Sequence, residues 1–140
     1  MSSSLSILAL PLEDCKRIPE GYFSESVLVW TKVFHPKDLV ELPPAVVPRK
    51  DVILSRFLCP APTLEEILEN LKLYKYLPAC LADEDGSYFT TVKWPPYAEE
   101  RMHRCGGTAV ESAWNTWLAM YKLRESEKEM KERERLNSDR

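Results

Sequence analysis

Two glycines, Gly106 and Gly107, stand directly before a helix-like pattern. A glycine-rich loop at a helix N-terminus can bind phosphate, because exposed backbone N–H groups and the helix dipole favour an anion. A nucleotide-binding loop of this kind also ends in Lys followed by Ser or Thr, and no such Lys follows here. We therefore expect a structural turn in which the glycines allow positive φ before the last helix. A small nucleotide-binding protein or enzyme stays an alternative.

A histidine and a cysteine, His103 and Cys105, lie two residues apart and would project from the same face of a strand. A catalytic Cys–His pair also needs a group that orients the histidine, and the sequence marks none nearby. His35, Cys59 and Cys80 do not complete the short paired spacings of a structural zinc site. We expect ordinary thiols, with no catalytic residue, no metal site, no cofactor and no enzymatic activity.

An acidic run, residues 83–85, precedes Gly86. A calcium-binding loop would need alternating ligands and a distal Glu at a fixed distance, and this pattern is absent. Asp-Gly between the strand-like runs 76–82 and 87–94 instead predicts a hairpin with a solvated turn.

Aromatic and basic side chains suggest a surface for a partner macromolecule. Trp114 and Trp117 lie on an apolar helical stripe, which favours core packing, whereas an exposed Trp would concentrate binding energy. Arg101 and Arg104, together with Lys93, would add a small basic patch beside the sheet. The candidate partner-binding residues are Trp94, Arg101, Arg104 and Trp117.

The composition limits the classes of partner and compartment. The 140 residues carry a net charge of -3, from 19 Lys and Arg against 22 Asp and Glu, which argues against a broad nucleic-acid surface. No apolar stretch approaches the roughly 20 residues of a membrane helix. The N-terminal apolar run is short and lacks a preceding Lys or Arg, so it does not resemble a signal peptide. We expect a cytoplasmic protein with free thiols, a protein partner, and a monomeric or small homo-oligomeric state.

The elements of the first half follow from prolines, β-branched residues and caps. We expect an irregular or weakly structured lead-in over residues 1–24, with a turn at 18–22. Strands are predicted at 27–34 and 52–58, the first of them central because both faces are apolar. The prolines of 36–50 predict a loop. Thr63 and Glu66 form a capping box that begins a helix at 63–72.

The elements of the second half are predicted from the same kinds of residues. Pro78 makes the first hairpin strand either an edge strand or one that begins late, and residues 99–105 would add a short strand. Thr108 and Glu111 form a second capping box for a helix at 108–124. The charged tail 124–140 extends this helix into solvent.

These elements predict an α+β fold with one antiparallel sheet. Both helices, 63–72 and 108–124, would pack on one face of it, in the rough order β-β-α-β-β-α. The domain would span residues 25–123.

One resemblance rests on the order of short aromatic strands, the segment 60–68 (PAPTLEEIL), a hairpin, and the helix segment 107–118 (GTAVESAWNTWL). This order resembles small uncharacterised proteins encoded by phages and prophages of gut bacteria, especially Bacteroidota, over about residues 25–123. The resemblance implies an accessory phage protein in a bacterial host cell that acts non-enzymatically by binding a host or phage macromolecule. It supplies no catalytic residues.

A second, partial resemblance covers about residues 76–123. The run 80–92 (CLADEDGSYFTTV), followed by 107–113 (GTAVESA), is similar to the HicB-like antitoxin pattern of strand, acidic-Gly turn, strand and helix. This resemblance implies a regulator that binds a small RNase toxin.

Overall fold

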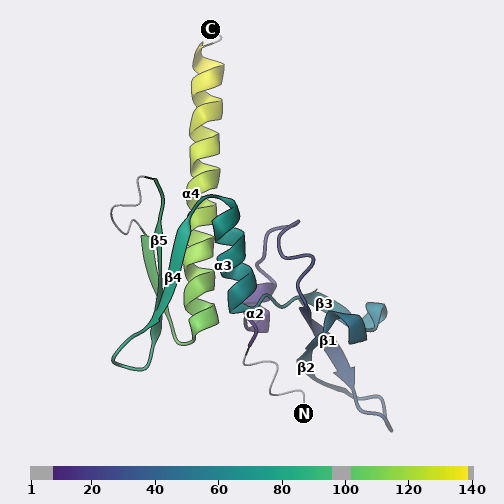
Figure 1. Cartoon of the computed structure of the whole chain (residues 1–140). Helices are drawn as coiled ribbons and strands as arrows, with labels where there is room; N and C mark the ends of the chain where they lie inside the picture. Colours follow the sequence, from purple (N-terminus) through teal and green to yellow (C-terminus); the bar gives the residue numbers. More distant parts are fainter. Residues whose placement is uncertain (1–7, 96–101, 139–140) are drawn as a thin grey trace. The chain divides into compact units, whose positions relative to one another are not determined.

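The computed structural model describes residues 8–95 and 102–138. The chain forms two compact units, an N-terminal unit, Met1–Tyr74, and a C-terminal unit, Lys75–Arg140. Figure 1 labels most of the elements of both units. The boundary between the units falls inside the segment 25–123 that we expected to form one domain.

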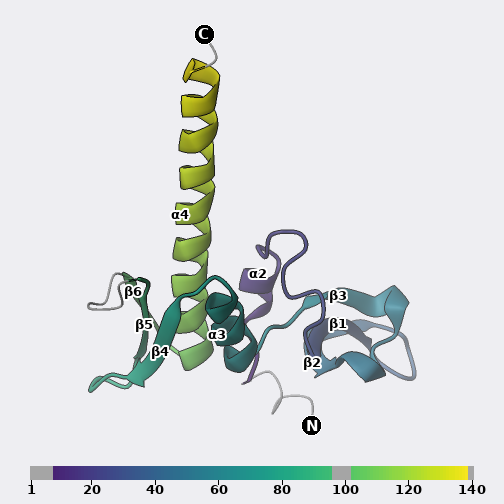
Figure 2. The same ribbon diagram turned by 45° about the horizontal axis from the view of Figure 1, so that its top comes forward.

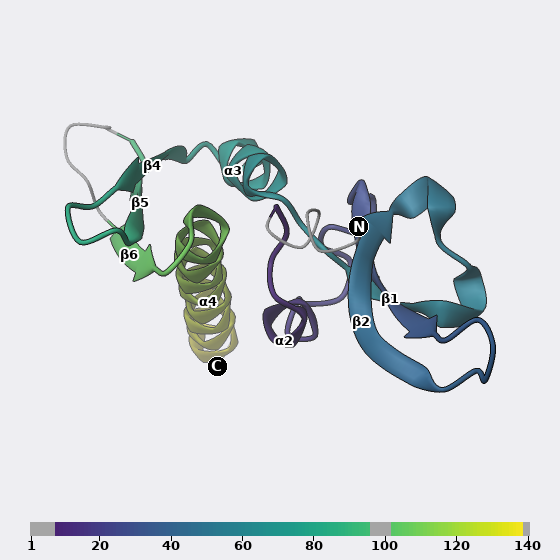
Figure 3. The same ribbon diagram turned by 90° about the horizontal axis from the view of Figure 1, so that it is seen from below.

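A three-stranded antiparallel sheet is the scaffold of the N-terminal unit. Its strands are β1 (Leu28–Phe34), β2 (Glu41–Pro48) and β3 (Phe57–Pro60), in the order β2-β1-β3. The central position predicted for the first strand is confirmed. The loop predicted at 36–50 is wrong over β2, which runs beside β1 (Figure 3). An edge strand tolerates proline because one side of it makes no ladder hydrogen bonds, and β2 is such a strand.

The strand predicted at 52–58 is wrong over its first part. The chain there forms two short 3₁₀ turns, Arg49–Asp51 and Leu54–Arg56, before β3 begins. The Arg56 N–H donates to the Ile53 carbonyl at 2.8 Å, which closes the second turn. The apolar residues 52–54 predicted a strand, but the backbone forms a local hydrogen-bonded turn there instead.

The lead-in at 1–24 is irregular, but its described part is packed rather than weakly structured. It contains the short helix α2 (Leu12–Cys15), and Leu10 is fully buried. The Trp30 indole donates to the Leu10 carbonyl at 2.9 Å, which fixes the segment against β1. The Tyr22 N–H donates to the Pro19 carbonyl, so the turn predicted at 18–22 is confirmed.

Helix α3 (Leu64–Leu73) confirms the first predicted helix and its capping box. The Glu66 carboxylate accepts from the Thr63 N–H at 2.9 Å, and the Glu66 N–H donates to the Thr63 hydroxyl at 3.3 Å. The same carboxylate also accepts from the Ser26 hydroxyl at 2.8 Å and from the Val27 N–H at 3.1 Å. One side chain therefore caps the helix and joins it to the residues that precede β1.

The C-terminal unit has its own three-stranded antiparallel sheet. Its strands are β4 (Leu77–Ala82), β5 (Tyr88–Lys93) and β6 (Met102–Gly106), in the order β4-β5-β6. The predicted hairpin is confirmed, with Gly86 at a φ of 88°, and Pro78 lies in an edge strand as expected. The strand predicted at 99–105 is confirmed over residues 102–105, and the rest of it lies outside the described residues.

Helix α4 (Ala109–Ser138) joins the last predicted helix and the charged tail into one continuous helix. Figures 1 and 2 show its first part beside the sheet of this unit and its second part projecting beyond that sheet. Buried polar contacts hold the two layers together. The Thr116 hydroxyl donates to the Thr90 carbonyl at 3.0 Å, and the Ser112 and Thr90 hydroxyl oxygens lie 2.7 Å apart.

The predicted α+β class is confirmed, and the order of elements matches roughly, with three strands rather than two before each main helix. The prediction of a single sheet is wrong. Strand β1 has β2 on one side and β3 on the other, so neither of its edges is open to the hairpin β4–β5. The prediction that both helices cover one sheet is wrong as well, because α3 and α4 belong to different units.

Candidate functional site

A groove of about 570 Å³ runs along the C-terminal unit between the edge strand β6 and one side of α4. We call it the β6–α4 groove. Strand β6 contributes Met102, Arg104 and Cys105, and helix α4 contributes Asn115, Leu118, Ala119, Lys122, Leu123 and Ser126. The helical residues are spaced three and four apart, which places them in one stripe along the helix.

The first turn of α4 approaches the end of β6 closely, and this approach depends on Gly106. A Cβ atom at this position would lie 2.5 Å from the Ser112 backbone nitrogen and 2.9 Å from the Glu111 carbonyl carbon. At Gly107 a Cβ would meet only the Glu111 carboxylate, at 3.6 Å.

The predicted positive φ at these two glycines is wrong, because of the four glycines of the chain only Gly21 and Gly86 adopt one. Gly106 is needed instead because the first turn of α4 occupies the space of its side chain. The turn predicted before the helix is present, and the Glu111 N–H donates to the Thr108 hydroxyl at 3.2 Å, which is half of the predicted capping box.

The outer edge of β6 borders the groove. The Asn115 side chain donates to the Cys105 carbonyl at 2.9 Å, and the Arg104 guanidinium donates to the His103 carbonyl at 2.9 Å. Because backbone groups in an antiparallel strand alternate between its two sides, the N–H groups of His103 and Cys105 face the same outer edge as their carbonyls. Side chains thus satisfy the two carbonyls, whereas no described residue accepts from the two N–H groups.

The charge of the groove is opposite to that of the whole chain. Among its described lining residues the ionised side chains are Arg104 and Lys122, both cations, whereas the net charge of the protein is -3. The ion pairs within the described part of the chain include neither of them. The same lining includes the apolar side chains of Met102, Leu118 and Leu123, the last of which is 37% exposed.

The structure brings the His103 and Cys105 side chains together. The Cys105 sulfur lies 3.7 Å from His103 Nε2, and the His103 ring contacts the Phe89 ring at 5.3 Å between centroids. Both residues are exposed. The described contacts of His103 include no carboxylate that would orient its ring, so the pair lacks the third member of a nucleophilic site.

The four residues predicted to bind a partner lie in different environments. Arg104 lines the groove. Trp94 is half-buried and packs edge-on against Tyr76, with ring centroids 6.0 Å apart. Trp117 is fully buried, and its ring stacks between two neighbouring aromatic rings, so it offers no surface to a partner and matches the core alternative. Arg101 lies outside the described residues.

Sequence reasoning missed Lys122 and the apolar residues Leu118 and Leu123. A helical projection of α4 contains a usable signal, because Ala119, Lys122 and Ser126 continue the row of Asn115 on a side of the helix that Trp114 does not occupy.

The N-terminal unit contains a buried thiol that the sequence did not indicate. Hydrogen bonding with the Cys59 thiol, together with burial, raises the pKa of Cys15 well above its ordinary range. The Cys15 thiol donates to the Leu10 carbonyl at 3.3 Å. The four cysteines are free, and Cys105 is the exposed one among them. Among the described residues, no three His, Cys, Asp or Glu side chains gather closely enough to hold a metal ion.

Comparison of the chain with protein-family models, curated proteins and solved structures returned no match. Within residues 8–95 and 102–138, no helix is long and apolar enough to span a membrane. The resemblance to phage-encoded proteins therefore stays a prediction, and the geometry of the groove is the main guide to function.

Proposed function

We propose that this chain is a phage-type accessory protein that acts non-enzymatically by binding a host or phage protein, and that the β6–α4 groove is its binding site. One observation carries the proposal. The groove combines apolar side chains, two cations and the exposed edge of a strand, in a protein that is acidic overall. Apolar contact area with a few placed polar groups is the usual composition of a recognition site.

A protein partner fits this groove better than a nucleic acid. Nucleic-acid sites combine many cations with aromatic side chains on which bases stack. Among the described residues that line the groove, the cations are Arg104 and Lys122, and none is aromatic. We place the interaction in the cytoplasm of a bacterial host cell, as the resemblance to phage-encoded proteins implies.

A HicB-like antitoxin is a second candidate, and one observation favours it. The C-terminal unit begins at Lys75, which nearly coincides with the start of that resemblance at residue 76. Strand β4, the acidic turn and strand β5 follow the implied order, but strand β6 lies between β5 and helix α4. This candidate requires the partner to be a small RNase toxin, so the identity of the partner separates the two.

The third candidate, a nucleotide binder, has less support. It depends on Gly106 and Gly107 as a phosphate loop. The packing of the α4 backbone against Gly106 explains that glycine without any ligand.

An affinity pull-down from bacterial lysate, with and without nuclease, tests the proposal. The wild-type protein is compared with the double variant Arg104→Glu and Lys122→Glu. A control double variant, Lys131→Glu and Arg133→Glu, changes the net charge equally on exposed positions of α4 outside the groove. We expect a protein captured by the wild type and the control but not by the groove variant. A partner retained equally by all three would refute the groove as the site, and a signal lost on nuclease treatment would indicate a nucleic acid.

A further inference from the structure

We infer that the β6–α4 groove binds an extended segment of its partner in which acidic side chains flank a large apolar one. This inference rests on the proposed function and adds the chemistry and conformation of the bound segment. Three features of the groove carry it: its charge, its apolar floor and its strand edge.

The charge selects acidic side chains. Arg104 lies on the β6 side of the groove and Lys122 on the α4 side, so a segment that lies between the two elements passes between two cations. A guanidinium has five N–H donors in a planar fork that matches a carboxylate. The one bond that Arg104 makes to the His103 carbonyl leaves donors for a second acceptor.

The floor selects an apolar anchor between the acidic groups. Leu118 and Leu123 lie on either side of Ala119 in the row of groove residues, and Met102 contributes from the strand. Because the alanine side chain is only a methyl group, the groove has the most room at Ala119, between larger neighbours. A leucine-sized or phenylalanine-sized side chain of the partner would bury apolar surface there.

The strand edge selects an extended backbone. The outward N–H groups of His103 and Cys105 need carbonyl acceptors, and a segment that adds to a sheet edge provides them from its own main chain. The residues of a helix use their carbonyls within the helix, so a helical partner leaves these two donors unmatched. An extended segment therefore satisfies the edge, the cations and the floor together.

The rest of α4 adds no cationic track for nucleic acid. Beyond the groove, residues 127–135 carry four exposed acidic and four exposed basic side chains, so their charges balance and do not extend the positive charge of the groove along a phosphate backbone.

Selection from a yeast-displayed library of random peptides tests the inference. The peptides have about 12 residues, because an extended peptide of that length spans roughly 40 Å. Labelled wild-type protein is sorted against the library with an excess of unlabelled groove variant, Arg104→Glu with Lys122→Glu, as competitor. We expect enriched peptides with more Asp and Glu than Lys and Arg, and with a large apolar residue between the acidic ones. A synthetic peptide from the enriched pool should bind the groove variant about tenfold or more weakly than the wild type, because each charge-assisted hydrogen bond lost is worth about that factor. The control variant, Lys131→Glu with Arg133→Glu, should bind it like the wild type.

Two results would overturn the inference: no enrichment at all, or enriched peptides without an acidic excess. Circular dichroism of both variants establishes that a loss of binding does not come from unfolding. The proposed function and the inferred chemistry of the bound segment can fail independently. If the lysate partner requires Arg104 and Lys122 but the selected peptides are not acidic, the groove is the site and only the inferred chemistry is wrong.

Discussion

Replacement of Gly106 by alanine should destabilise the C-terminal unit, although the change adds only one methyl group. The added Cβ would lie 2.5 Å from the Ser112 nitrogen, a separation that real Cβ contacts essentially never show. The atoms in conflict belong to the backbone, so no side-chain rotation relieves the overlap. The first turn of α4 is held by the bond from the Ser112 N–H to the Thr108 carbonyl at 3.0 Å, so strand and helix must move apart.

The expected loss follows from this geometry. Overpacking of a well-packed contact costs about 1–3 kcal/mol, and the lack of a movable side chain favours the upper part of that range, about 2–3 kcal/mol. For a unit of this size, each kcal/mol lowers Tm by about 4–8 °C, so the unfolding temperature should fall by about 10–20 °C.

Gly107→Ala is the matched control, because the same methyl group there meets only a flexible carboxylate at 3.6 Å. Its φ is not positive, so alanine should leave stability unchanged or raise it by about 0.4–1 kcal/mol. Urea unfolding followed by far-ultraviolet circular dichroism compares the two variants, since α4 contributes most of the helix signal. Equal midpoints for Gly106→Ala and wild type would refute the account of why a glycine stands there.

Three further predictions concern a helix cap, a turn carboxylate and the cysteines. Glu66→Ala should lower the free energy of unfolding by about 1–2 kcal/mol, because one carboxylate caps α3 and also accepts from two groups near β1; an unchanged urea midpoint would contradict this. Hydrogen bonds from the Ser87 hydroxyl and N–H lower the pKa of Asp85. The ionised carboxylate therefore stabilises the fold above the ordinary carboxyl pKa, and this stabilisation is lost as the pH falls through the lowered pKa. Ser87→Ala should raise the pKa of Asp85 in an NMR titration, and an unchanged pKa would refute the role of Ser87. Iodoacetamide should alkylate Cys105 well before Cys15, because Cys105 is exposed while burial and hydrogen bonding raise the pKa of Cys15; mass spectrometry that finds equal rates would contradict the burial of Cys15.

The features that could be predicted from the sequence are those with a local physical cause. Thr63 and Glu66 make reciprocal bonds within one turn, so their spacing alone predicts the start of α3. Asp85-Gly86 determines a turn that needs positive φ, and the hairpin follows from it.

The features that could not be predicted depend on partners distant in the sequence. Strand β2 contains three prolines and reads as a loop, until its place at the edge beside β1 is known. The division into two sheets depends likewise on which strands occupy both edges of β1. Gly106 was predicted in a turn, but it is the last residue of β6, and the reason for a glycine there could not be predicted, because the conflict with Ser112 exists only once α4 packs on β6.

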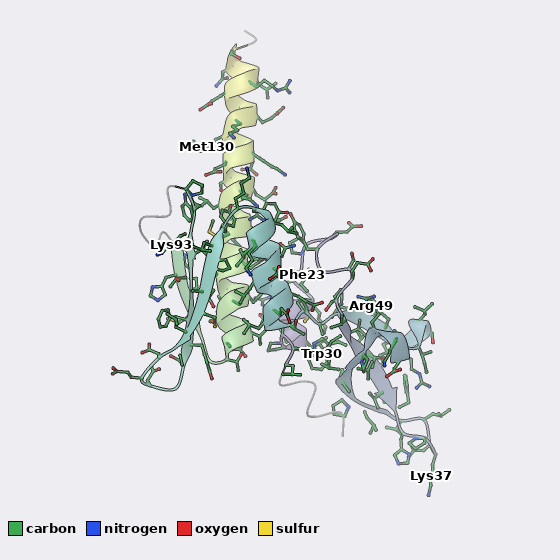
Figure 4. The ribbon with its side chains drawn as sticks, viewed as in Figure 1. Phe23, Trp30, Lys37, Arg49, Lys93 and Met130 are labelled. Carbon is green, nitrogen blue, oxygen red and sulfur yellow. The ribbon has the colours of Figure 1, made fainter. Side chains whose placement is uncertain are left out.

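The candidate site divides in the same way. The sequence predicts that Arg104 belongs to a basic patch beside the sheet, and the structure places Arg104 in the lining of the groove. Its counterpart Lys122 became visible only when β6 and α4 lay side by side. A large apolar side chain does not by itself indicate the site. Trp117 is buried, and Met130, on the projecting part of α4 (Figure 4), is 61% exposed but lies outside the groove.

The central claim is that the β6–α4 groove binds a protein partner through Arg104 and Lys122. The most direct test is isothermal titration calorimetry of the partner captured from lysate, against wild type, the groove variant and the charge-matched control. We predict that Arg104→Glu with Lys122→Glu raises Kd by at least about tenfold, and that Lys131→Glu with Arg133→Glu leaves it within about twofold. An equal Kd for the groove variant and wild type, with both proteins folded, would contradict the claim.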